Sequence, residues 1–320
     1  MNATLIIPSV HSRAALLDRA LGHLEAQRFG GEVIVSDHSP PEHAGVLGEV
    51  LARHRGLKLL ALEHDPAWHF LQRLTDCAES AQSDYVAVHA DDDFMFVDAL
   101  GACVEFLERN ADFSAAKGRM LFFSLQAGKA PVVGRHESYA RTEDDVARRV
   151  AQHASNFNPT LYALHRRAQF IEAHSTALAH TRNVIFWQYL ASCLTLVQGK
   201  LHVAEVPYYY RQDNPEGWRG TLLRERARDH WPWLILAPEF PALLAAFAAG
   251  VRQALAAAKV TMDTDFEHEL EDAYVWLIRR ALCGRVKDEP ADRDRAFLQR
   301  AQSAGTLENR LLTGCIERCR

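Results

Sequence analysis

The sequence has little of what marks a nucleic-acid-binding or a disulfide-stabilised protein. Its 320 residues include 36 basic and 41 acidic side chains, for a formal net charge of -5. It therefore lacks the basic footprint that nucleic acid requires, and no nucleic acid partner is expected. The six cysteines are scattered without a C-x-x-C pair, which suits reduced core positions better than a disulfide framework. Any bound polyanion must be met by local charges.

Long hydrophobic runs are also missing. No segment reaches the roughly 20 uninterrupted apolar residues that a membrane-spanning helix needs. The first residues have neither the basic start nor the long apolar stretch of a signal peptide. With 48% hydrophobic and 24% charged residues, the composition is that of a soluble globular protein. We expect a cytoplasmic protein, at most peripheral at the inner face of the membrane.

Short apolar strands alternate with helical segments through the first third of the chain. Each strand is rich in β-branched or apolar residues, and each helix repeats its apolar residues at helical spacing. This alternation predicts an α/β fold, Rossmann-like, with a mostly parallel sheet and helices on both faces. The predicted strands are residues 4–8, 32–36, 57–62 and 84–89, and the predicted helices are residues 13–27, 43–53, 68–81 and 97–109.

The rest of the chain changes character near residue 213, after which strand signals vanish. We therefore predict two parts, an α/β domain over residues 1–215 and a helical C-terminal region over residues 216–320. The middle segments predict strands at 119–125, 160–165 and 201–206 and helices at 143–153 and 183–198; the later ones predict helices at 222–228, 241–258, 266–282 and 293–304.

One helix of the C-terminal region carries a clear apolar stripe. Its residues recur at near-helical spacing, so the stripe must be buried. It is expected to pack either on the first domain or on a second copy of the chain, in a homodimer. The stripe consists of Phe240, Leu243, Leu244, Phe247 and Val251.

Three consecutive aspartates, Asp91, Asp92 and Asp93, directly follow the strand at 84–89. Neighbouring carboxylates raise one another's pKa unless a cation lies between them. Mg²⁺ and Mn²⁺ favour such oxygen ligands, together with substrate phosphates. The alternative is a helix N-terminus, where the helix dipole favours acids and one aspartate caps the first turn. The triplet is a candidate metal site.

Asp37 ends the second predicted strand. In sheets of this kind ligands bind at the carboxyl ends of the strands, so Asp37 is expected near the triplet. There its carboxylate would accept hydrogen bonds from a nucleoside, or it would form an Asx turn before Ser39 and Pro40. The pairing of Asp37 with the triplet favours the nucleoside role.

These motifs resemble the family 2 glycosyltransferases, which have the GT-A fold. The resemblance extends over residues 4–212. The matching segments are TLIIPSVHSR at 4–13, similar to the family's opening strand and loop; EVIVSDHS at 32–39, similar to its E-I-I-V-V-D-D-G-S strand; YVAVHADDD at 85–93, similar to its D-x-D strand; and VAEVP at 203–207 with Tyr210 and Arg211, similar to its late Y-R element.

The resemblance implies an inverting transferase with a nucleotide-sugar donor, UDP-sugar favoured, and a Mn²⁺ or Mg²⁺ cofactor. The acceptor would be a glycan, a lipid-linked molecule or a protein. Because the family's first D-x-D aspartate falls on Ala90, either the metal ligands are Asp91 and Asp93 or one ligand is missing, and we favour Asp91 and Asp93. The residues implied to contact the donor are Pro8, Ser9, Arg13, Asp37, Ser39, Asp91, Asp92 and Arg211.

The catalytic base is the main departure from the family pattern. Counted back from the glycine at 199, the family's E-D pair falls near Trp187 and Gln188, and glutamine cannot accept a proton. The remaining base candidates are His180, Asp213 and Glu216. Each has a structural alternative, His180 as a polar residue flanking a helix and the two acids as turn residues.

Aromatic segments and one arginine near the end of this region have two readings each. Arg211 could hold a phosphate bidentately or pack on the surface through its aliphatic stem. Tyr208, Tyr209 and Tyr210 could stack on a sugar ring or fill the core. The stretch at 231–236 (WPWLIL) could line an acceptor groove, lie on a membrane surface or belong to the core.

Three functions follow from these features. The first is glycosyl transfer from a nucleotide-sugar. The second is a catalytically impaired glycosyltransferase-like module that binds nucleotide or glycan, because Gln188 stands where a base is expected. The third, nucleotidyl transfer, lacks its glycine-rich basic loop, since residues 8–13 contain no glycine.

Overall fold

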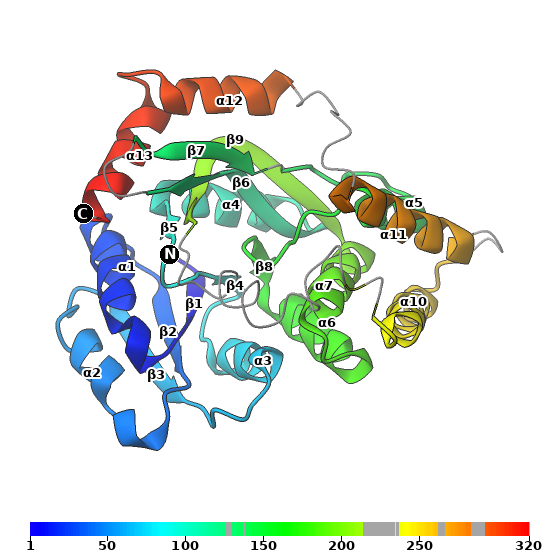
Figure 1. The fold of residues 1–320 in the computed structure, drawn as a ribbon, viewed down its shortest axis with the longest axis horizontal. Helices are drawn as coiled ribbons and strands as arrows, with labels where there is room; N and C mark the ends of the chain where they lie inside the picture. The colour runs from blue at the N-terminus through cyan, green and yellow to red at the C-terminus, as the bar shows by residue number, and fades with distance from the viewer. Residues whose placement is uncertain are drawn as a thin grey trace.

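A central sheet with helices on both faces forms the protein (Figure 1). The computed structural model describes residues 1–125, 130–136, 138–213, 234, 237–261, 266–282 and 292–319. The strands of the sheet run in the order β3-β2-β1-β4-β8-β6-β9-β5, with β7 paired to β6. The predicted α/β fold is confirmed.

The N-terminal half of the sheet is parallel. It consists of β1 (Ala3–Ser9), β2 (Glu32–Asp37), β3 (Lys58–Glu63) and β4 (Tyr85–Val88). β1 lies in the middle, paired with β2 on one side and β4 on the other. Because the strands are parallel, their carboxyl ends share one edge of the sheet.

The other half of the sheet is mixed. β8 (Leu164–Arg166) is antiparallel to β4 and to β6 (Phe113–Ser124), while β6 runs parallel to β9 (Lys200–Gln212). β7 (Val132–His136) pairs antiparallel with β6, and β5 (Phe94–Met95) with the end of β9. The last pairing brings the chain after the aspartates against the last residues of β9.

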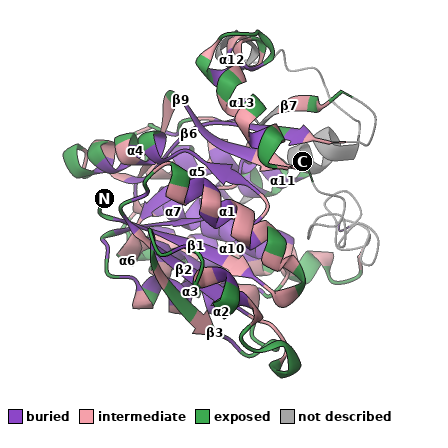
Figure 2. Ribbon diagram, turned by 90° about the vertical axis from the view of Figure 1, so that its left-hand side faces the viewer, coloured by how far each residue is buried: buried purple, intermediate pink, exposed green. Residues whose placement is uncertain are grey.

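One hydrophobic core lies between the sheet and a group of mostly consecutive helices. α7 is apolar on nearly every side, as expected of a helix buried between others. Buried residues colour this layer and the strands purple in Figure 2. The helices of this core are α3 (Phe70–Ser80), α5 (Val146–Ser155), α6 (Arg167–His180), α7 (Val184–Gln198), α10 (Phe240–Ala257) and α11 (Phe266–Leu282).

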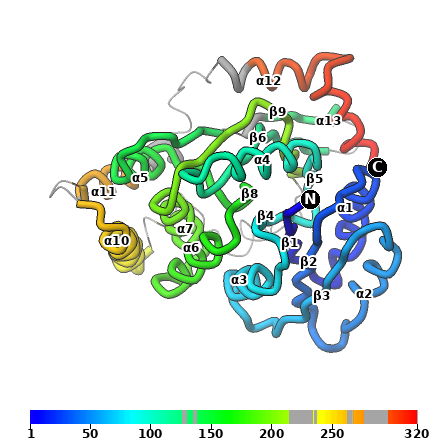
Figure 3. The backbone as a smooth tube through the Cα atoms, turned by 180° about the vertical axis from the view of Figure 1, so that it is seen from behind, coloured from blue at the N-terminus to red at the C-terminus, as the bar shows by residue number. Residues whose placement is uncertain are grey.

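A second core covers the opposite face and joins the two ends of the chain. Phe297, Leu312 and Cys315 of the last two helices are buried in it. Figure 3 shows the C-terminus beside α1. The helices of this core are α1 (Ala14–Ala26), α2 (Val46–Leu51), α4 (Val97–Arg109), α12 (Asp292–Gln302) and α13 (Leu307–Arg318).

The apolar stripe of α10 packs on the first domain, as one of the two sequence alternatives predicts. Phe247, Val251 and Leu255 are buried, and the Phe247 ring stacks on Tyr189 of α7 at 4.3 Å. Among the described residues α10 is the one helix long and apolar enough to cross a membrane by composition, with a mean hydropathy of 1.4. Its buried face is part of a protein core here.

Several elements differ from the sequence prediction. The helix expected over 43–53 shortens to α2, preceded by a 3-10 turn η2 (Pro41–His43), because Gly45 adopts a left-handed φ of 86° at its start. The strand expected over 201–206 extends as β9 through all three tyrosines, which are fully buried. α6, α13, β5 and β7 have no sequence prediction. The predicted helix at 222–228 and the segment 231–236, except the buried Leu234, lie outside the described residues.

Candidate functional site

The carboxyl ends of β1, β2 and β4 bring together the polar residues that the sequence predicts. Ser9 pairs with Asp37 across β1 and β2, and His89 N donates to Ile6 O, which fixes the end of β4 beside β1. The aspartate triplet follows at once. We call residues 90–93 the aspartate loop.

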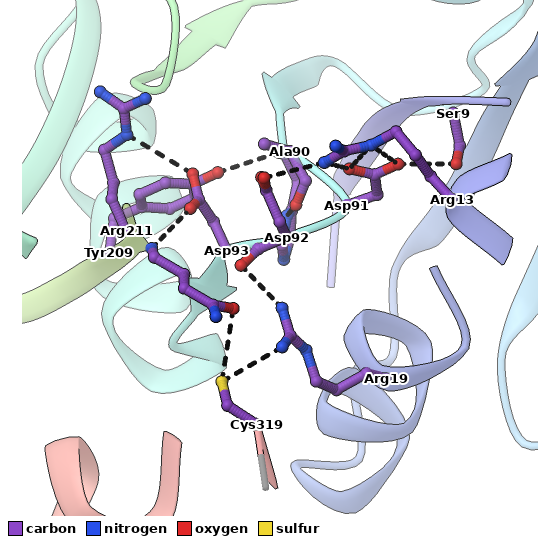
Figure 4. Close-up of polar contacts among 12 residues, drawn as sticks. Ser9, Arg13, Arg19, Ala90, Asp91, Asp92, Asp93, Tyr209, Arg211 and Cys319 are labelled. Atoms are coloured by element: carbon purple, nitrogen blue, oxygen red, sulfur yellow. Dashed lines mark hydrogen bonds and ion pairs between the residues drawn. The ribbon is translucent and has the colours of Figure 1, made fainter. Parts of the chain in front are cut away.

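Asp91 is held on all sides by its own chain. Arg13 Nε lies 2.9 Å from both Asp91 oxygens and Nη2 lies 2.5 Å from Oδ1, while Ser9 Oγ donates to Oδ2 at 2.7 Å (Figure 4). Arg13 belongs to the 3-10 turn η1 (His11–Arg13) between β1 and α1. Its Nη2 also reaches Asp92 Oδ2 at 2.8 Å. Arg13 is therefore the cation that lies between two of the three aspartates.

The main chain of the aspartate loop is tied to the C-terminal helix. Arg19 of α1 donates from Nη2 to Asp92 O at 2.9 Å and from Nη1 to Cys319 Sγ at 3.1 Å. Cys319 in turn donates to Gln212 Oε1 at 3.4 Å. The C-terminal region therefore contributes to this site through Cys319, which caps α13.

Asp93 is buried but incompletely satisfied. Gln212 N donates to its Oδ1 at 2.9 Å. Its Oδ2 lies 3.5 Å from Arg211 Nε, and both of these atoms are buried without a hydrogen-bond partner in the described part of the chain. The two side chains thus form an ion pair at 3.5 Å with no hydrogen bond between them. A ligand can supply the missing hydrogen bonds.

Aromatic rings pack against the guanidinium of Arg211. Its guanidinium lies 5.0 Å from the centre of the Tyr162 ring, and Tyr162 stacks on Tyr209 at 4.9 Å. The Tyr209 hydroxyl accepts a hydrogen bond from Ala90 N at 2.9 Å. Arg211 is therefore oriented by stacking, and the buried tyrosine holds the start of the aspartate loop.

The second strand supplies a separate polar group beside the first. Asp37 is 7% exposed, and its Oδ1 accepts from Ser39 N at 2.8 Å. Ser39 Oγ accepts from His11 N at 2.7 Å, and the His11 ring stacks on His43 at 3.7 Å. Asp37 thus forms the Asx turn that the sequence offers as the alternative to its nucleoside role. Pro8 of β1 lies beside this strand, in register with Ser36.

Burial changes the protonation of the aspartate loop. It raises the pKa of Asp93 to about 7, although the Arg211 guanidinium acts in the opposite direction. Burial also raises the pKa of Asp91, opposed by the hydrogen bonds and charge of Arg13. The neighbouring His89 has its pKa lowered to about 4 by burial, so its ring is neutral and Nδ1–H donates to Ala90 O at 2.6 Å. Burial thus penalises the negative charge of Asp93, and the Arg211 guanidinium is the cation that opposes this effect.

The aspartates differ in how well they suit a divalent metal. Asp93 fits, because its buried Oδ2 is an oxygen donor without a hydrogen-bond partner among the described residues. Asp91 does not fit in this arrangement, since Arg13 and Ser9 use both of its oxygens. No group of three or more His, Cys, Asp or Glu side chains suited to a metal occurs within the described ranges. A Mg²⁺ or Mn²⁺ site here would rely on one or two carboxylates and substrate phosphates.

The candidate bases lie at different places. Asp213 follows Gln212, is exposed, and donates its N–H to Phe123 O at 2.7 Å, so it borders the site. His180 ends α6 and faces Gly250 of α10. Gln188 is a half-buried residue of α7, and no contact joins it to the aspartate loop in the described structure. Glu216 lies outside the described residues.

Four residues of the site have no sequence prediction: Arg19, Tyr162, Gln212 and Cys319. Arg19 lies on α1, six residues after Arg13 of the preceding 3-10 turn. Any amphipathic helix can carry an arginine at such a position, so the sequence does not single it out. Gln212 holds Asp93 through its backbone N–H, for which a sequence carries no signal, and its side chain accepts from Cys319. Cys319 arrives from the other end of the chain, so only the tertiary structure reveals it.

Comparison with known proteins supports the fold. No protein-family model and no curated protein sequence matches this chain. Among solved structures, the chain is similar to residues 1–349 of S. aureus TarS in complex with UDP-GlcNAc, with a TM-score of 0.57 and 13% identity over 91% of this chain and 78% of that chain. The same TarS fragment alone and with UDP gives TM-scores of 0.53, at 12% and 13% identity, over 89% of this chain and 92% of that one. The chain has a glycosyltransferase fold.

Proposed function

We propose that this protein is a nucleotide-sugar glycosyltransferase of the family 2 type. It would transfer a sugar, with inversion, from a UDP-sugar or a related donor to a glycan, a lipid-linked molecule or a protein. The observation that carries the proposal is the incomplete pair of Asp93 and Arg211, placed on a glycosyltransferase fold at the edge where the carboxyl ends of β1, β2 and β4 meet. Its support from the comparisons is the shared fold with a protein that binds UDP-GlcNAc.

The roles follow from charge and position. Asp37 is the acceptor for the nucleoside, because its second oxygen remains available beside the Asx turn. Arg211, stacked on Tyr162, is the cation for the donor's diphosphate. Arg13 and Ser9 hold Asp91 and with it the shape of the loop. The chain thereby positions the donor, and positioning with electrostatic stabilisation is the main requirement when a phosphate group leaves.

Mn²⁺ or Mg²⁺ would be held by Asp93 with help from Asp92. When bound, such an ion neutralises the developing charge of a leaving diphosphate. Asp92 retains some exposure, at 13% of its side chain, so it can turn toward the same side. This assignment moves the predicted metal pair from Asp91 and Asp93 to Asp92 and Asp93.

Asp213 is the base candidate that borders the site. Its exposed side chain follows Gln212, whose N–H holds Asp93. A carboxylate there would accept the proton of the acceptor hydroxyl as the sugar is transferred. His180 lies beside Gly250 of α10, so it would have to approach the acceptor from a different element of the fold.

Donor hydrolysis and thermal stability test the function together. UDP-sugars, GDP-sugars and CDP-sugars are added with and without Mn²⁺, and both the melting temperature and the release of nucleoside diphosphate are measured. We expect UDP-sugars with Mn²⁺ to raise the melting temperature, since a ligand stabilises in proportion to its affinity, and to be hydrolysed slowly. No stabilisation by any nucleotide or nucleotide-sugar would refute the proposal.

A second function is favoured by one observation, the glutamine at 188 in place of a base. A catalytically impaired module would bind the nucleotide-sugar but release no diphosphate, even with acceptor extracts present. Binding without turnover in the same assay would therefore select this alternative.

A further inference from the structure

Four arginines are buried in the described part of the chain, and one of them differs from the others. Arg119 pairs with Glu205, Arg141 donates to three carbonyl oxygens, and Arg149 donates to two. Arg73 of α3 is 7% exposed, yet its side chain makes no hydrogen bond or ion pair within the described residues. Its guanidinium is a buried charge that no described residue satisfies with a hydrogen bond or an ion pair.

The unbound atoms of Arg73 are specific. Nε and Nη1 are buried without a partner in the described structure. Nη2 also makes no hydrogen bond there, and it provides the edge that still meets solvent. The closest support is the ring of Phe70, whose centre lies 5.5 Å from the guanidinium carbon. A cation–π contact alone does not offset the cost of burying an unpaired charge.

Arg73 acts electrostatically on two histidines and on the Cys77 thiol, and the Asp37 carboxylate acts on one of these histidines. Burial is the main cause that lowers the pKa values of His38 and His69, and the positive charge of Arg73 lowers both further. His38 Nδ1 is a further buried atom without a partner among the described residues. The acid nearest along α3, Asp76, is bonded to His64 at 3.0 Å. Within the described residues Arg73 therefore has no anionic partner.

Arg73 belongs to the same edge of the sheet as the aspartate loop. His38 directly follows Asp37, and its N–H donates to Ser9 O at 3.3 Å. Ser9 Oγ in turn binds Asp91. α3 lies in the core on one face of the sheet, and α1, which follows Arg13, lies in the core on the other. Arg13 and Arg73 thus belong to elements on opposite faces of the sheet near this edge. Arg13 is paired with Asp91 and Asp92, whereas Arg73 is paired with no described carboxylate.

We infer that Arg73, together with His38, forms a binding subsite for a phosphoryl group. Phosphate oxygens supply the negative charge and the several acceptors that a free guanidinium fork needs. Because the side chain has no hydrogen bond to break, it can turn its donors toward an anion at the exposed edge. The inference deepens the proposed function and rests on it only for the source of the phosphate, which is either the nucleotide donor or a phosphorylated acceptor.

The first test uses the stability of the free protein. Replacing an unsatisfied buried arginine by an apolar side chain of similar length removes the cost of burying its charge and breaks no hydrogen bond, although the cation–π contact with Phe70 is lost. Arg73→Met should therefore raise the melting temperature of the ligand-free protein by about 2 °C. Arg149→Met is the matched control, and it should lower the melting temperature because Arg149 bonds two carbonyls. A lower melting temperature for Arg73→Met, or its failure to fold, would show a structural role and overturn the inference.

The second test uses the anion itself. Inorganic phosphate and pyrophosphate should raise the melting temperature of the natural protein and of Arg149→Met more than sodium chloride of equal ionic strength does. They should not raise that of Arg73→Met, whereas Arg73→Lys should keep part of the shift. An equal shift in the natural protein and in Arg73→Met would place the anion elsewhere and reject the subsite.

The third test identifies the source of the phosphate. UMP and UDP are compared with uridine, and glycerol 3-phosphate represents a phosphorylated acceptor. If the donor's phosphate binds here, Arg73→Met should weaken UDP at least tenfold and uridine little; if an acceptor's does, it should weaken glycerol 3-phosphate alone. If Arg73→Met weakens the binding of neither UDP nor glycerol 3-phosphate, the inference is overturned. A protein that binds phosphate through Arg73 but no nucleotide would refute only the proposed function.

Discussion

The two ends of the aspartate loop show opposite treatments of a buried carboxylate. Asp91 receives hydrogen bonds from Arg13 and Ser9 on both oxygens. Asp93, two residues later, keeps one oxygen without a hydrogen-bond partner in the described structure. A protein gains stability from the first arrangement and gives some up in the second. Under the proposed function, this difference separates the residue that holds the shape of the loop, Asp91, from the residue that would meet a ligand, Asp93.

The largest effect is expected at the unsatisfied end. Asp93→Asn should lower glycosyl transfer about 1,000-fold, in the range for loss of a main electrostatic group. The melting temperature should stay equal or rise, because Asp93 is held in an environment that penalises its charge. Asp98→Asn, an exposed acid at the start of α4, is the control and should keep full activity. A destabilised but active Asp93→Asn would reverse the assignment of the two ends.

A smaller effect, on stability, is expected at the satisfied end. Asp91→Asn leaves the partly buried Arg13 without its strongest partner, so the free energy of unfolding in urea should fall by about 3 kcal/mol. Glu105→Gln breaks an exposed ion pair with Arg109 and should change it by less than about 0.5 kcal/mol. If both substitutions lowered the free energy of unfolding equally, the Asp91–Arg13 pair would contribute no more than an exposed surface ion pair.

The smallest effect extends the comparison to a buried amine. Burial lowers the pKa of Lys117 to about 7, helped by Arg141 and Arg119, and its Nζ donates to Asn158 at 2.6 Å. The folded state therefore releases a proton that the unfolded chain keeps up to about pH 10.5, so stability should rise with pH above 7. Between pH 7 and 9 this gain is about 2 kcal/mol.

Lys117→Met removes the titrating group and is the variant to compare. Its unfolding free energy at pH 7 should equal or exceed that of the natural protein, and the rise between pH 7 and 9 should shrink. Urea unfolding at the two pH values measures both quantities. An unchanged slope would mean that Lys117 stays protonated in the fold.

The sequence predicts the parallel half of the protein well. β1, β2, β3 and α4 lie within a residue or two of their predicted ranges, because β-branched strands and amphipathic helices have strong local patterns. α6 has no prediction, since its apolar residues show almost no helical periodicity. β5, two residues long, exists only because β9 pairs with it.

The site divides in the same way. Asp37, the aspartate triplet and Arg211 follow strands or belong to one, so sequence order places them at one edge of the sheet. What the sequence could not supply is the pairing of charges. Whether Arg13 bonds Asp91 or Asp93, and whether Arg73 bonds anything, depends on side-chain directions fixed by the whole fold.

The bond between Arg19 and Cys319 joins residues 300 positions apart, and this has a consequence during protein synthesis. A ribosome completes the aspartates long before it adds the cysteine, so the emerging chain carries the loop without its last support for most of translation. Closing so long a loop is slow compared with forming the neighbouring strands and helices. The nascent protein can thus assemble its sheet early, but it fixes the geometry of the aspartate loop only after residue 319 has left the exit tunnel.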